Sequence, residues 1–369
     1  MGAIFTIQKW SEKWDLNTWP LADRLAFSKA MSVEIFQSSE WFAHLWRYGF
    51  ETAPHRCWSW EIKTPDNSFS VRIPLVQGAS GQGLSSLSNY YSCLFGPESD
   101  ECITLLPDEN QWDLGIKLLR SIPESHALRL QPLDAQSPWM GSLEKNLQRN
   151  GFWTRSVFCS ANWYQTVPAE GFKKYWAERP SALANTVRRG KRRLGAAGEW
   201  RIDLHSGSGN AQDLEKAVRA YEEVYANSWK QPEPCRAFMP GLVQLAAQKG
   251  WLRLGVLWLN SVPLAAQLWL TTPLKANIYK LAYAKGCEKF SAGSILTAAM
   301  MEHAMDVDKV AEVDYLSGDD GYKADWMEKR RERTELIAID MKKVAGWVWA
   351  ANAISKSGSH ALKKKFLKS

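Results

Sequence analysis

Side chains that could move a proton gather between residues 314 and 326. Asp314, Asp319 and Asp320 lie close together in the chain, beside Tyr322 and Lys323. Grouped carboxylates raise one another's proton affinity, which is one way to tune a general base toward neutral pH. We take Asp314, Tyr322 and Lys323 as candidate catalytic residues, and Asp319 and Asp320 as candidate substrate-binding residues. A solvated Asp/Gly turn, with Lys323 paired to a carboxylate, would have the same composition.

A second candidate site is a short turn before a predicted helix at residues 294–306. Gly293 allows close backbone approach, and Ser294 can cap the helix, whose first amides point at any bound anion. Lys285 would add positive charge, and Ser291 a hydroxyl. We take Lys285, Ser291, Gly293 and Ser294 as candidate cofactor-binding residues, although an ordinary strand-to-helix turn needs the same residue types.

Residues 180–195 predict a helix that carries two stripes of cations. Arg188 and Arg192 form one stripe, and Arg189 and Arg193 form the other, each at i,i+4 spacing. Like charges so placed repel by about 0.2–0.5 kcal/mol per pair. Such a helix either faces water or binds an anion, and both interpretations stay open. Under the second, Arg188 and Arg192 are candidate substrate-binding residues.

A long amphipathic helix is predicted at residues 214–229. Glu222 borders its apolar stripe and Trp229 ends it, so both are candidate substrate-binding residues, although a glutamate at this border is also typical of a surface. The segment SGSGN at residues 206–210 resembles a nucleophile elbow in composition alone. Its flanks are wrong for one, which argues against a serine hydrolase.

These candidates depend on two successive stretches of α/β character. Residues 1–160 form the first unit, with helices predicted near 111–121 and 141–150 around a strand at 127–133. Residues 161–341 form the second. Three consecutive strands with short turns span 251–284, and a loop, a helix, a strand, a polar loop and a closing strand at 332–340 follow. The fold class is α/β (α+β), with mixed central sheets flanked by helices.

Composition limits the class of protein. Hydrophobic residues make up 45% and charged residues 23%, which is typical of a packed globular chain. The six cysteines have no metal-ligand or disulfide-framework spacing, which predicts no metal site and a reducing compartment. No signal-peptide core and no run of 18 apolar residues occurs, so we expect a cytoplasmic protein.

The net charge of +7 is concentrated at the C-terminus. Residues 342–369 contain seven lysines and no acidic residue, so residues 1–341 are balanced. A solvated basic tail is one interpretation. The other is peripheral contact with the inner membrane or an acidic partner, because four apolar residues could share a helical face beside the lysines: Trp347, Val348, Ala351 and Ile354.

The order of elements in the second unit resembles the core of GNAT acyltransferases. The residues are similar to CelD-type acetyltransferases associated with cellulose and exopolysaccharide biosynthesis, and through them to FemAB peptidyltransferases, which carry two GNAT-like units. The first unit matches only in outline, through FQSSEW and SNYYSCLFGP. The usual signature Arg/Gln-x-x-Gly-x-Gly/Ala is absent from the loop at residues 285–294. The matching segments are YWAERPSALANTVRRGKRRL, AYEEVYANSWKQPEP, GWLRLGVLWLNSVPLAAQLWL, IYKLAYAKGCEKFSAGSILTAAMM and VDYLSGDDGYKADWMEKRRER.

The resemblance implies two tandem GNAT-like units and an acyl-CoA-dependent N-acyltransferase. The co-substrate would be acetyl-CoA or another acyl-CoA, and the acceptor an amine such as an amino sugar in exopolysaccharide or cell-envelope biosynthesis. In this family Tyr322 would protonate the leaving thiolate, and the turn at Gly293 would hold the pyrophosphate.

Two alternatives remain from the same resemblance. One is a FemAB-like aminoacyl transferase that uses aminoacyl-tRNA, whose phosphates would meet the cations at residues 188–193. The other is a non-catalytic GNAT scaffold of a polysaccharide-assembly machine, with its lysine tail at the membrane. Nucleic acid is expected as a partner only in the first alternative.

Overall fold

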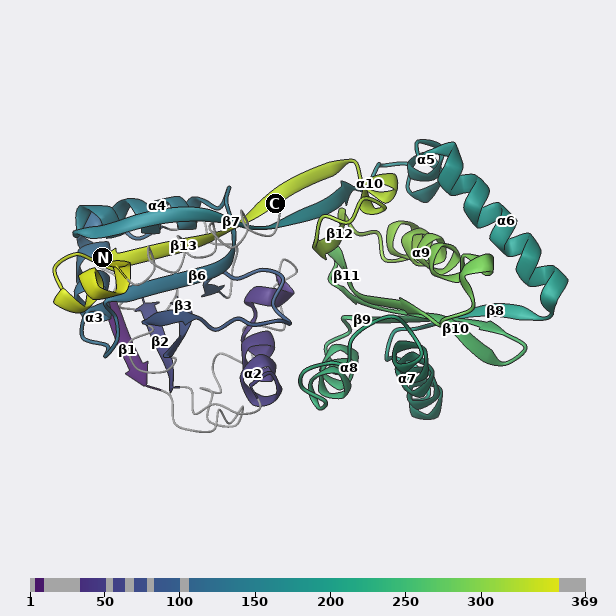
Figure 1. Ribbon diagram of the computed structural model, residues 1–369, viewed down its shortest axis with the longest axis horizontal. Coiled ribbons are helices and arrows are strands. Elements are labelled where there is room, and N and C mark those ends of the chain that lie inside the picture. Colours follow the sequence, from purple (N-terminus) through teal and green to yellow (C-terminus); the bar gives the residue numbers. More distant parts are fainter. Residues whose placement is uncertain are drawn as a thin grey trace, which may run out of the picture. The chain divides into compact units, whose positions relative to one another are not determined.

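The computed structural model describes residues 4–9, 34–50, 56–63, 70–77, 83–99 and 106–351, and these fold into two compact units (Figure 1). Unit 1 falls within residues 1–30, 36–160 and 332–369, and unit 2 within 31–35 and 161–331. The sequence-based boundary between residues 160 and 161 lies at the end of the second segment of unit 1. Residues 332–341, which the sequence analysis assigns to the second unit, fall within unit 1.

Unit 1 is built on a mixed sheet. Its strand order is β1-β2-β3-β4-β6-β13-β7, with β5 beside β3. The residues of β13 from Arg333 to Ile339 pair antiparallel with β6, which explains why the expected closing strand of the second unit lies here. The strands are β1 (Ile4–Lys9), β2 (Arg56–Lys63), β3 (Ser70–Gln77), β4 (Leu84–Ser86), β5 (Glu98–Ser99), β6 (Ala127–Asp134), β7 (Phe152–Thr166) and β13 (Lys329–Asp340).

The helices of unit 1 begin at residues that stabilise helix N-termini. Ser38 caps α2 (Ser39–Tyr48), and Asp108 forms a capping box with Gln111 at α3 (Glu109–Leu119). A proline opens α4 (Pro138–Arg149). Helix α3 packs against β1, β2 and α4, and Trp112 on α3 lies edge to face with Trp60 on β2 at 6.0 Å. Both α3 and α4 begin two or three residues before the predicted helices.

Unit 2 contains the strand meander that the sequence predicted. The strand order is β8-β9-β10-β11-β12-β7, in which β8, β9, β10 and β11 pair antiparallel with one another, β11 and β12 pair in parallel, and β12 pairs antiparallel with β7. Asn260 and Ser261 join β9 to β10 with positive φ at both positions, which is the geometry of a tight two-residue hairpin. The strands are β8 (Trp200–His205), β9 (Leu252–Leu259), β10 (Val262–Thr271), β11 (Lys275–Tyr283) and β12 (Glu312–Ser317).

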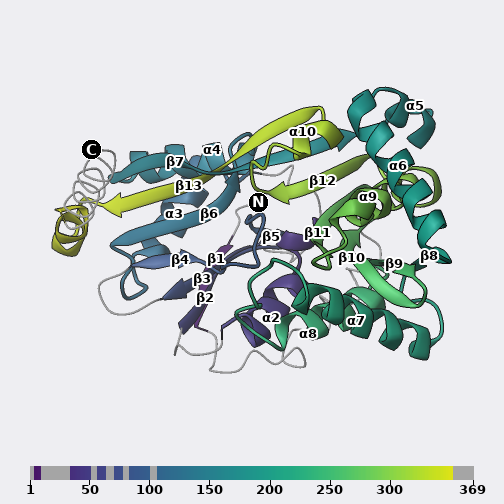
Figure 2. The same cartoon turned by 45° about the vertical axis from the view of Figure 1, so that its right-hand side comes forward.

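Helices cover both faces of this meander. Figures 1 and 2 show α7 (Ala211–Ala226) and α8 (Phe238–Gln248) on one face, and α9 (Ala292–Glu302) with α6 (Ser181–Ala197) on the other. Because both faces are covered, β10 is buried along its whole length after Val262. Short helices α5 (Phe172–Ala177) and α10 (Lys323–Trp326) flank these elements. Helix α8 was not predicted, because its apolar residues are nearly continuous rather than periodic.

Two helix ends differ from the sequence-based bounds. Helix α7 stops at Ala226 instead of residue 229, because the Ser228 hydroxyl bonds the Tyr225 carbonyl and two prolines follow. Helix α9 starts at Ala292, and its last turn widens into a π-helix at His303–Val307. Trp229 is therefore a loop residue.

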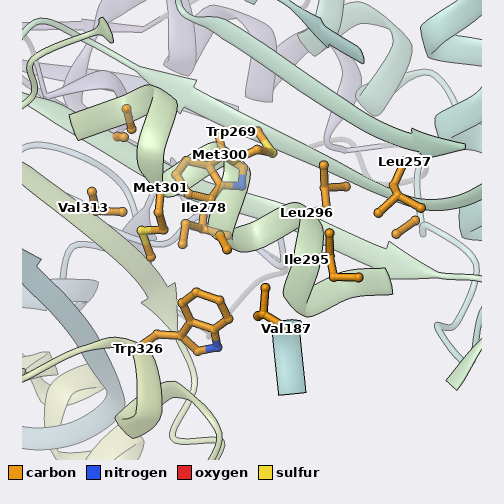
Figure 3. Packing of buried hydrophobic residues seen from close by; sticks show 14 of the residues in the cluster. Val187, Leu257, Trp269, Ile278, Ile295, Leu296, Met300, Met301, Val313 and Trp326 are labelled. Carbon is orange, nitrogen blue, oxygen red and sulfur yellow. The ribbon is translucent and has the colours of Figure 1, made fainter. Parts of the chain in front are cut away.

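The core of unit 2 lies between the meander and helices α6 and α9. Figure 3 shows Trp269 and Ile278 from the sheet meeting Ile295 and Met300 from α9, with Val187 of α6 beyond them. This burial of apolar side chains fixes α9 on the sheet, and with it the turn that precedes α9. Within the described residues, no helix has the length and apolarity needed to cross a bilayer.

Candidate active site

Strands β11 and β12 start side by side and then separate. They pair in parallel from Lys275–Glu312 to Asn277–Asp314. Beyond that point β11 continues to Tyr283 along β10, whereas β12 turns to β7. Past Asn277, β11 has no neighbour among the described strands on the side that β12 has left. On β12, the Leu316 amide donates to Asp314, and the carbonyls of Tyr315, Leu316 and Ser317 accept from Lys323 or Asn162. The edge of β11 is therefore the part of the divergence that can offer main-chain groups to a ligand.

Asp314 holds the bend that separates the strands. Its Oδ1 accepts from the Leu316 amide at 2.6 Å and from Asn162 Nδ2 at 2.5 Å, and its Oδ2 lies 2.5 Å from Arg331. Leu316 has a φ of +56°, which is rare for a side chain of this size and needs such support. Asp314 is 1% exposed. These contacts give its carboxylate a positioning role at the divergence.

Ion pairs surround this bend. Arg331 also contacts Glu312 at 2.7 Å and lies over the ring of Tyr164 at 4.1 Å. Lys275 reaches Glu34 at 2.7 Å and Glu312 at 3.4 Å. Each charge in this half-buried group has an opposite charge beside it, which is the condition for retaining charges away from water.

The predicted anion-binding turn lies where α9 begins, at the end of the loop 284–291 that follows β11. Ser291 is the N-cap residue with a φ of +53°, and no side chain caps the helix. Among the described residues, the amides of Ala292, Gly293 and Ser294 find no acceptor. Open amides at a helix N-terminus favour an anion. The structure thus brings the candidate residues Ser291, Gly293 and Ser294 together.

Buried polar groups fix the first turn of α9 from beneath. Gln267 Nε2 donates to the Gly293 carbonyl at 3.2 Å and to Thr297 Oγ1 at 2.7 Å, and the Thr297 hydroxyl also donates to Gly293 at 3.0 Å. Trp269 Nε1 donates to Gln267 at 2.9 Å. Since Gln267 is fully buried, its position is set by this network and the turn is held in place.

Lys285 opens the loop between β11 and α9. Its amide donates to the Asn227 carbonyl at 3.0 Å, which joins the loop to the end of α7, and its side chain is exposed. Cys287 follows, and burial, together with the nearby Glu288, raises the pKa of its thiol. This cysteine is therefore a poor nucleophile. Lys285 is free to add charge beside the turn.

Lys323 is buried in the loop that follows β12. Its ammonium donates to the carbonyls of Tyr315, Ser317 and Gly318 at 3.4, 2.8 and 3.2 Å, and it is 4% exposed. Asp320 lies 3.7 Å away. An ammonium engaged in this way holds the loop in shape. A catalytic role for Lys323 remains a prediction.

The three aspartates of the predicted cluster do not form a shared carboxylate group. Asp319 accepts from Arg330 at 2.9 Å and from Trp163 at 2.9 Å, and these hydrogen bonds lower the pKa of its carboxyl. Asp314 is paired with Arg331. Each carboxylate has its own cation, so mutual repulsion, which the spacing in sequence suggested, is not the dominant effect here.

Tyr322 stands at the edge of the same loop. Its ring lies edge to face with Tyr315 at 5.9 Å and is 45% exposed. Burial of the hydroxyl, aided by Asp320, raises the pKa of Tyr322 to about 12. The phenol is therefore protonated at neutral pH and can donate a proton.

The cations of α6 lie on its exposed side. Arg188 donates to Asn185 one turn earlier at 2.7 Å, and Arg193 donates to the Lys289 carbonyl in the loop before α9 at 2.7 Å. Arg192 is exposed. Of the two stripes, only the one containing Arg193 contacts that loop in the described structure.

The remaining substrate-binding candidates are separated. Glu222 is exposed on α7. Trp229 is 46% exposed and its ring lies 4.3 Å from that of Tyr283, the last residue of β11. A Cβ at Gly293 would lie 3.4 Å from Tyr283, so this aromatic pair stands beside the start of α9. Trp229 therefore lies near the turn before α9, and substrate-binding roles for Trp229 and Glu222 stay predictions.

Sequence reasoning missed a charged group on the loop between α7 and α8. Glu233 lies 2.8 Å from Lys280 of β11. Burial, then Lys280, lowers the pKa of Lys230 in the same loop, whereas Asp320 and Glu233 act in the opposite direction. Lys280 lies past the last β11–β12 pair. The signal that could have found this group is the charge pattern of WKQPEP, which ends the segment AYEEVYANSWKQPEP already matched to the family.

Comparison with known proteins agrees with this geometry. Residues 181–324 match the family described as Acetyltransferase (GNAT) domain. The matched segment contains the divergence, the turn before α9 and Lys323. No curated protein matches the chain.

Solved structures share the fold over most of the chain. FemX is similar with a TM-score of 0.57 at 9% identity, covering 86% of this chain and 95% of its own. A conserved protein of unknown function from Bacteroides thetaiotaomicron is similar with a TM-score of 0.54 at 12% identity, covering 86% of this chain and 96% of its own. The C-terminal domain of a putative lysylphosphatidylglycerol synthetase from Agrobacterium fabrum is similar with a TM-score of 0.51 at 13% identity, covering 90% of this chain and 97% of its own. The predicted α/β class with mixed strands flanked by helices is confirmed.

Proposed function

We propose that the protein is an acyl-CoA-dependent N-acyltransferase. The observation that carries this proposal is the divergence of β11 from β12, with the open amides of Ala292, Gly293 and Ser294 at the start of α9, where Gly293 lies beside Tyr283, the last residue of β11. A thioester donor needs main-chain donors for its carbonyl and a binding place for its phosphates. The edge of β11 past Asn277 would serve the carbonyl and the first amides of α9 the phosphates, and both lie in the segment that matches the GNAT domain.

The side chains around the divergence suit the transfer. Tyr322, protonated at neutral pH, would give its proton to the leaving thiolate. Asp314 and Lys323 would keep the loop after β12 in place for this step. Lys285 and Arg193 would add positive charge near the phosphates, and Ser291 and Ser294 their hydroxyls.

We further propose that the acyl group is acetyl and the acceptor an amine such as an amino sugar of an exopolysaccharide or the cell envelope. This part rests on the resemblance of the matching segments to CelD-type acetyltransferases. It is separable from the donor assignment, because donor binding needs only the α9 turn and the divergence.

Calorimetric titration with acetyl-CoA, longer acyl-CoAs and free CoA tests the donor assignment. We expect saturable one-to-one binding, weakened at least about ten-fold by Ser294→Glu, which places a carboxylate at the open amides. Leu274→Glu, at an exposed position on the β10–β11 turn, is the control and should bind as the parent does. Absence of binding by any acyl-CoA would contradict the proposal.

A second candidate is aminoacyl transfer from charged tRNA. It is favoured by the exposed cations of α6, where Arg188, Arg189 and Arg192 have no carboxylate within ion-pair distance in the described structure. If this candidate holds, tRNA binding should weaken steeply with salt and be reduced by Arg188→Gln with Arg192→Gln. Binding of neither donor would instead favour a non-catalytic scaffold.

A further inference from the structure

The loop between α7 and α8 places three charged residues beside the diverging part of β11. Lys230 and Glu233 come from this loop, and Lys280 from β11, three residues past the last pair with β12. Asp320, from the loop after β12, acts electrostatically on Lys230 together with Glu233 and Lys280. The group therefore lies within electrostatic reach of both strands that border the divergence.

Glu233 is buried without a full set of donors. Its side chain is 12% exposed, and its Oε1 lies 2.8 Å from Lys280 Nζ. Neither carboxylate oxygen accepts a hydrogen bond of good geometry from the described residues. Native proteins rarely leave a buried carboxylate oxygen in this state unless a water or a ligand supplies the donor.

The charges around Glu233 determine whether a charged or an uncharged ligand is favoured there. Lys280 is 14% exposed and pairs with Glu233, whereas Lys230 has no acidic group within ion-pair distance in the described structure. Burial, and after it the charge of Lys280, lowers the pKa of Lys230, so a further positive charge beside these groups is disfavoured. A neutral amine, which donates N–H bonds without adding charge, meets both conditions. A neutral amine is also the form that attacks a thioester.

Other carboxylates near the divergence are less suited to this task. Asp314 is held by Arg331 and the Leu316 amide, and Asp319 by Arg330 and Trp163. Their lone pairs are directed at protein donors. Glu233 differs because Lys280 approaches only its Oε1, at 2.8 Å, and Oε2 accepts from no donor among the described residues.

We propose that Glu233, Lys230 and Lys280 form the acceptor subsite, in which Glu233 binds an uncharged primary amine and takes its proton. This inference rests on the proposed N-acyltransferase function. As the new C–N bond forms, the nitrogen loses a proton to Glu233. The C–S bond breaks, and the thiolate takes a proton from Tyr322. Glu233 then releases its proton to water, and Tyr322 regains one from water.

The test separates amine binding from donor binding. Glucosamine, ethanolamine and spermidine are titrated calorimetrically into the full chain saturated with free CoA, so that no turnover is required. Glucosamine or ethanolamine should bind, and Glu233→Gln should weaken that binding at least about ten-fold while CoA binding is unchanged. Spermidine, which retains several charges, should bind least. Glu215→Gln, at an exposed position on α7, is the matched control and should have no effect.

Transfer assays give the second measurement. With acetyl-CoA and the amine that binds best, Glu233→Gln should lower kcat about 10²–10⁴-fold, the range for loss of a general base. Amine binding or kcat unchanged in Glu233→Gln, or no binding of any of the three amines by the parent chain, would overturn the acceptor subsite. Failure of CoA itself to bind would instead count against the proposed function.

Discussion

At the scale of single residues, the loop after β12 contains groups whose contacts determine what each can do. Asp314 and Lys323 are buried and bonded to backbone atoms, so they shape the loop. Tyr322 is half-exposed and keeps its proton at neutral pH. The difference in role follows from burial. A side chain whose lone pairs or protons are all bound by the protein has none left for a substrate.

Removing the guanidinium beside Asp314 should expose the structural role of this pair. Arg331→Met leaves a carboxylate at 1% exposure without its cation, and we expect a loss of about 3–5 kcal/mol in the free energy of unfolding. Urea denaturation measures it. Adding Asp314→Asn should recover part of the loss, since the uncompensated charge is then gone. A double variant no more stable than Arg331→Met would show that the charge is not the cause.

Replacing the phenol of Tyr322 should affect turnover more than donor binding. Tyr322→Phe should lower kcat about 10²-fold or more, with acyl-CoA affinity within two-fold of the parent, as expected for loss of a general acid. Its raised pKa, about 12, keeps the phenol protonated below that pH. Ionisation of Tyr322 should therefore not limit kcat between about pH 6 and pH 10. A kcat of Tyr322→Phe equal to that of the parent chain would show that Tyr322 is not the general acid.

At the scale of elements, the position of the α9 turn depends on α6. Gly190 lies where α6 crosses the loop before α9, and a Cβ there would be 2.4 Å from the Phe290 carbonyl oxygen. Because the obstacle is backbone, it cannot rotate away. The contact brings Arg193 to the Lys289 carbonyl. Sequence showed a cationic helix, and the packing of Gly190 explains which of its cations meets the loop.

A side chain at this crossing should disturb donor binding. Gly190→Ala should reduce acyl-CoA affinity by at least about five-fold and lower the free energy of unfolding by about 1–3 kcal/mol, because the loop must shift. Gly195→Ala lies in the same helix with nothing nearer than 3.9 Å, and it should be neutral or stabilising by up to about 1 kcal/mol. Titration with acetyl-CoA and thermal unfolding measure both. Equal behaviour of the two variants would refute the crossing as the cause.

At the scale of the whole molecule, the charge of the chain is unevenly distributed. The seven lysines after residue 341 account for the entire net charge. The helical residues 344–351 of unit 1 expose Val344, Trp347 and Val348 at 81, 59 and 56%. The predicted apolar face is present as far as the structure describes it, and Ile354 lies outside the described residues. Apolar side chains beside lysines are typical of segments that contact anionic membranes.

Deleting residues 352–369 should weaken membrane contact without affecting catalysis. The deletion removes five lysines, each contributing about 1 kcal/mol near an anionic surface. Co-sedimentation with phosphatidylglycerol vesicles should fall strongly, and acyl-CoA binding should not change. Phosphatidylcholine vesicles are the control and should bind neither form. Full sedimentation of the truncated chain with anionic vesicles would contradict a role for the tail lysines.

The sequence alone determined the α/β class, the meander at 251–284, and the turn and loop that contain the candidate site, because periodicity and turn chemistry are local properties. It also placed Gly293 and Ser294 near a helix start, although the helix begins at Ala292 and Ser291, rather than Ser294, is its N-cap residue. Only the tertiary structure decided that Asp314 pairs with Arg331, that residues 332–340 belong to unit 1, and that Glu233 meets Lys280. These outcomes depend on strand pairing and burial between residues far apart in the chain, which no local pattern encodes.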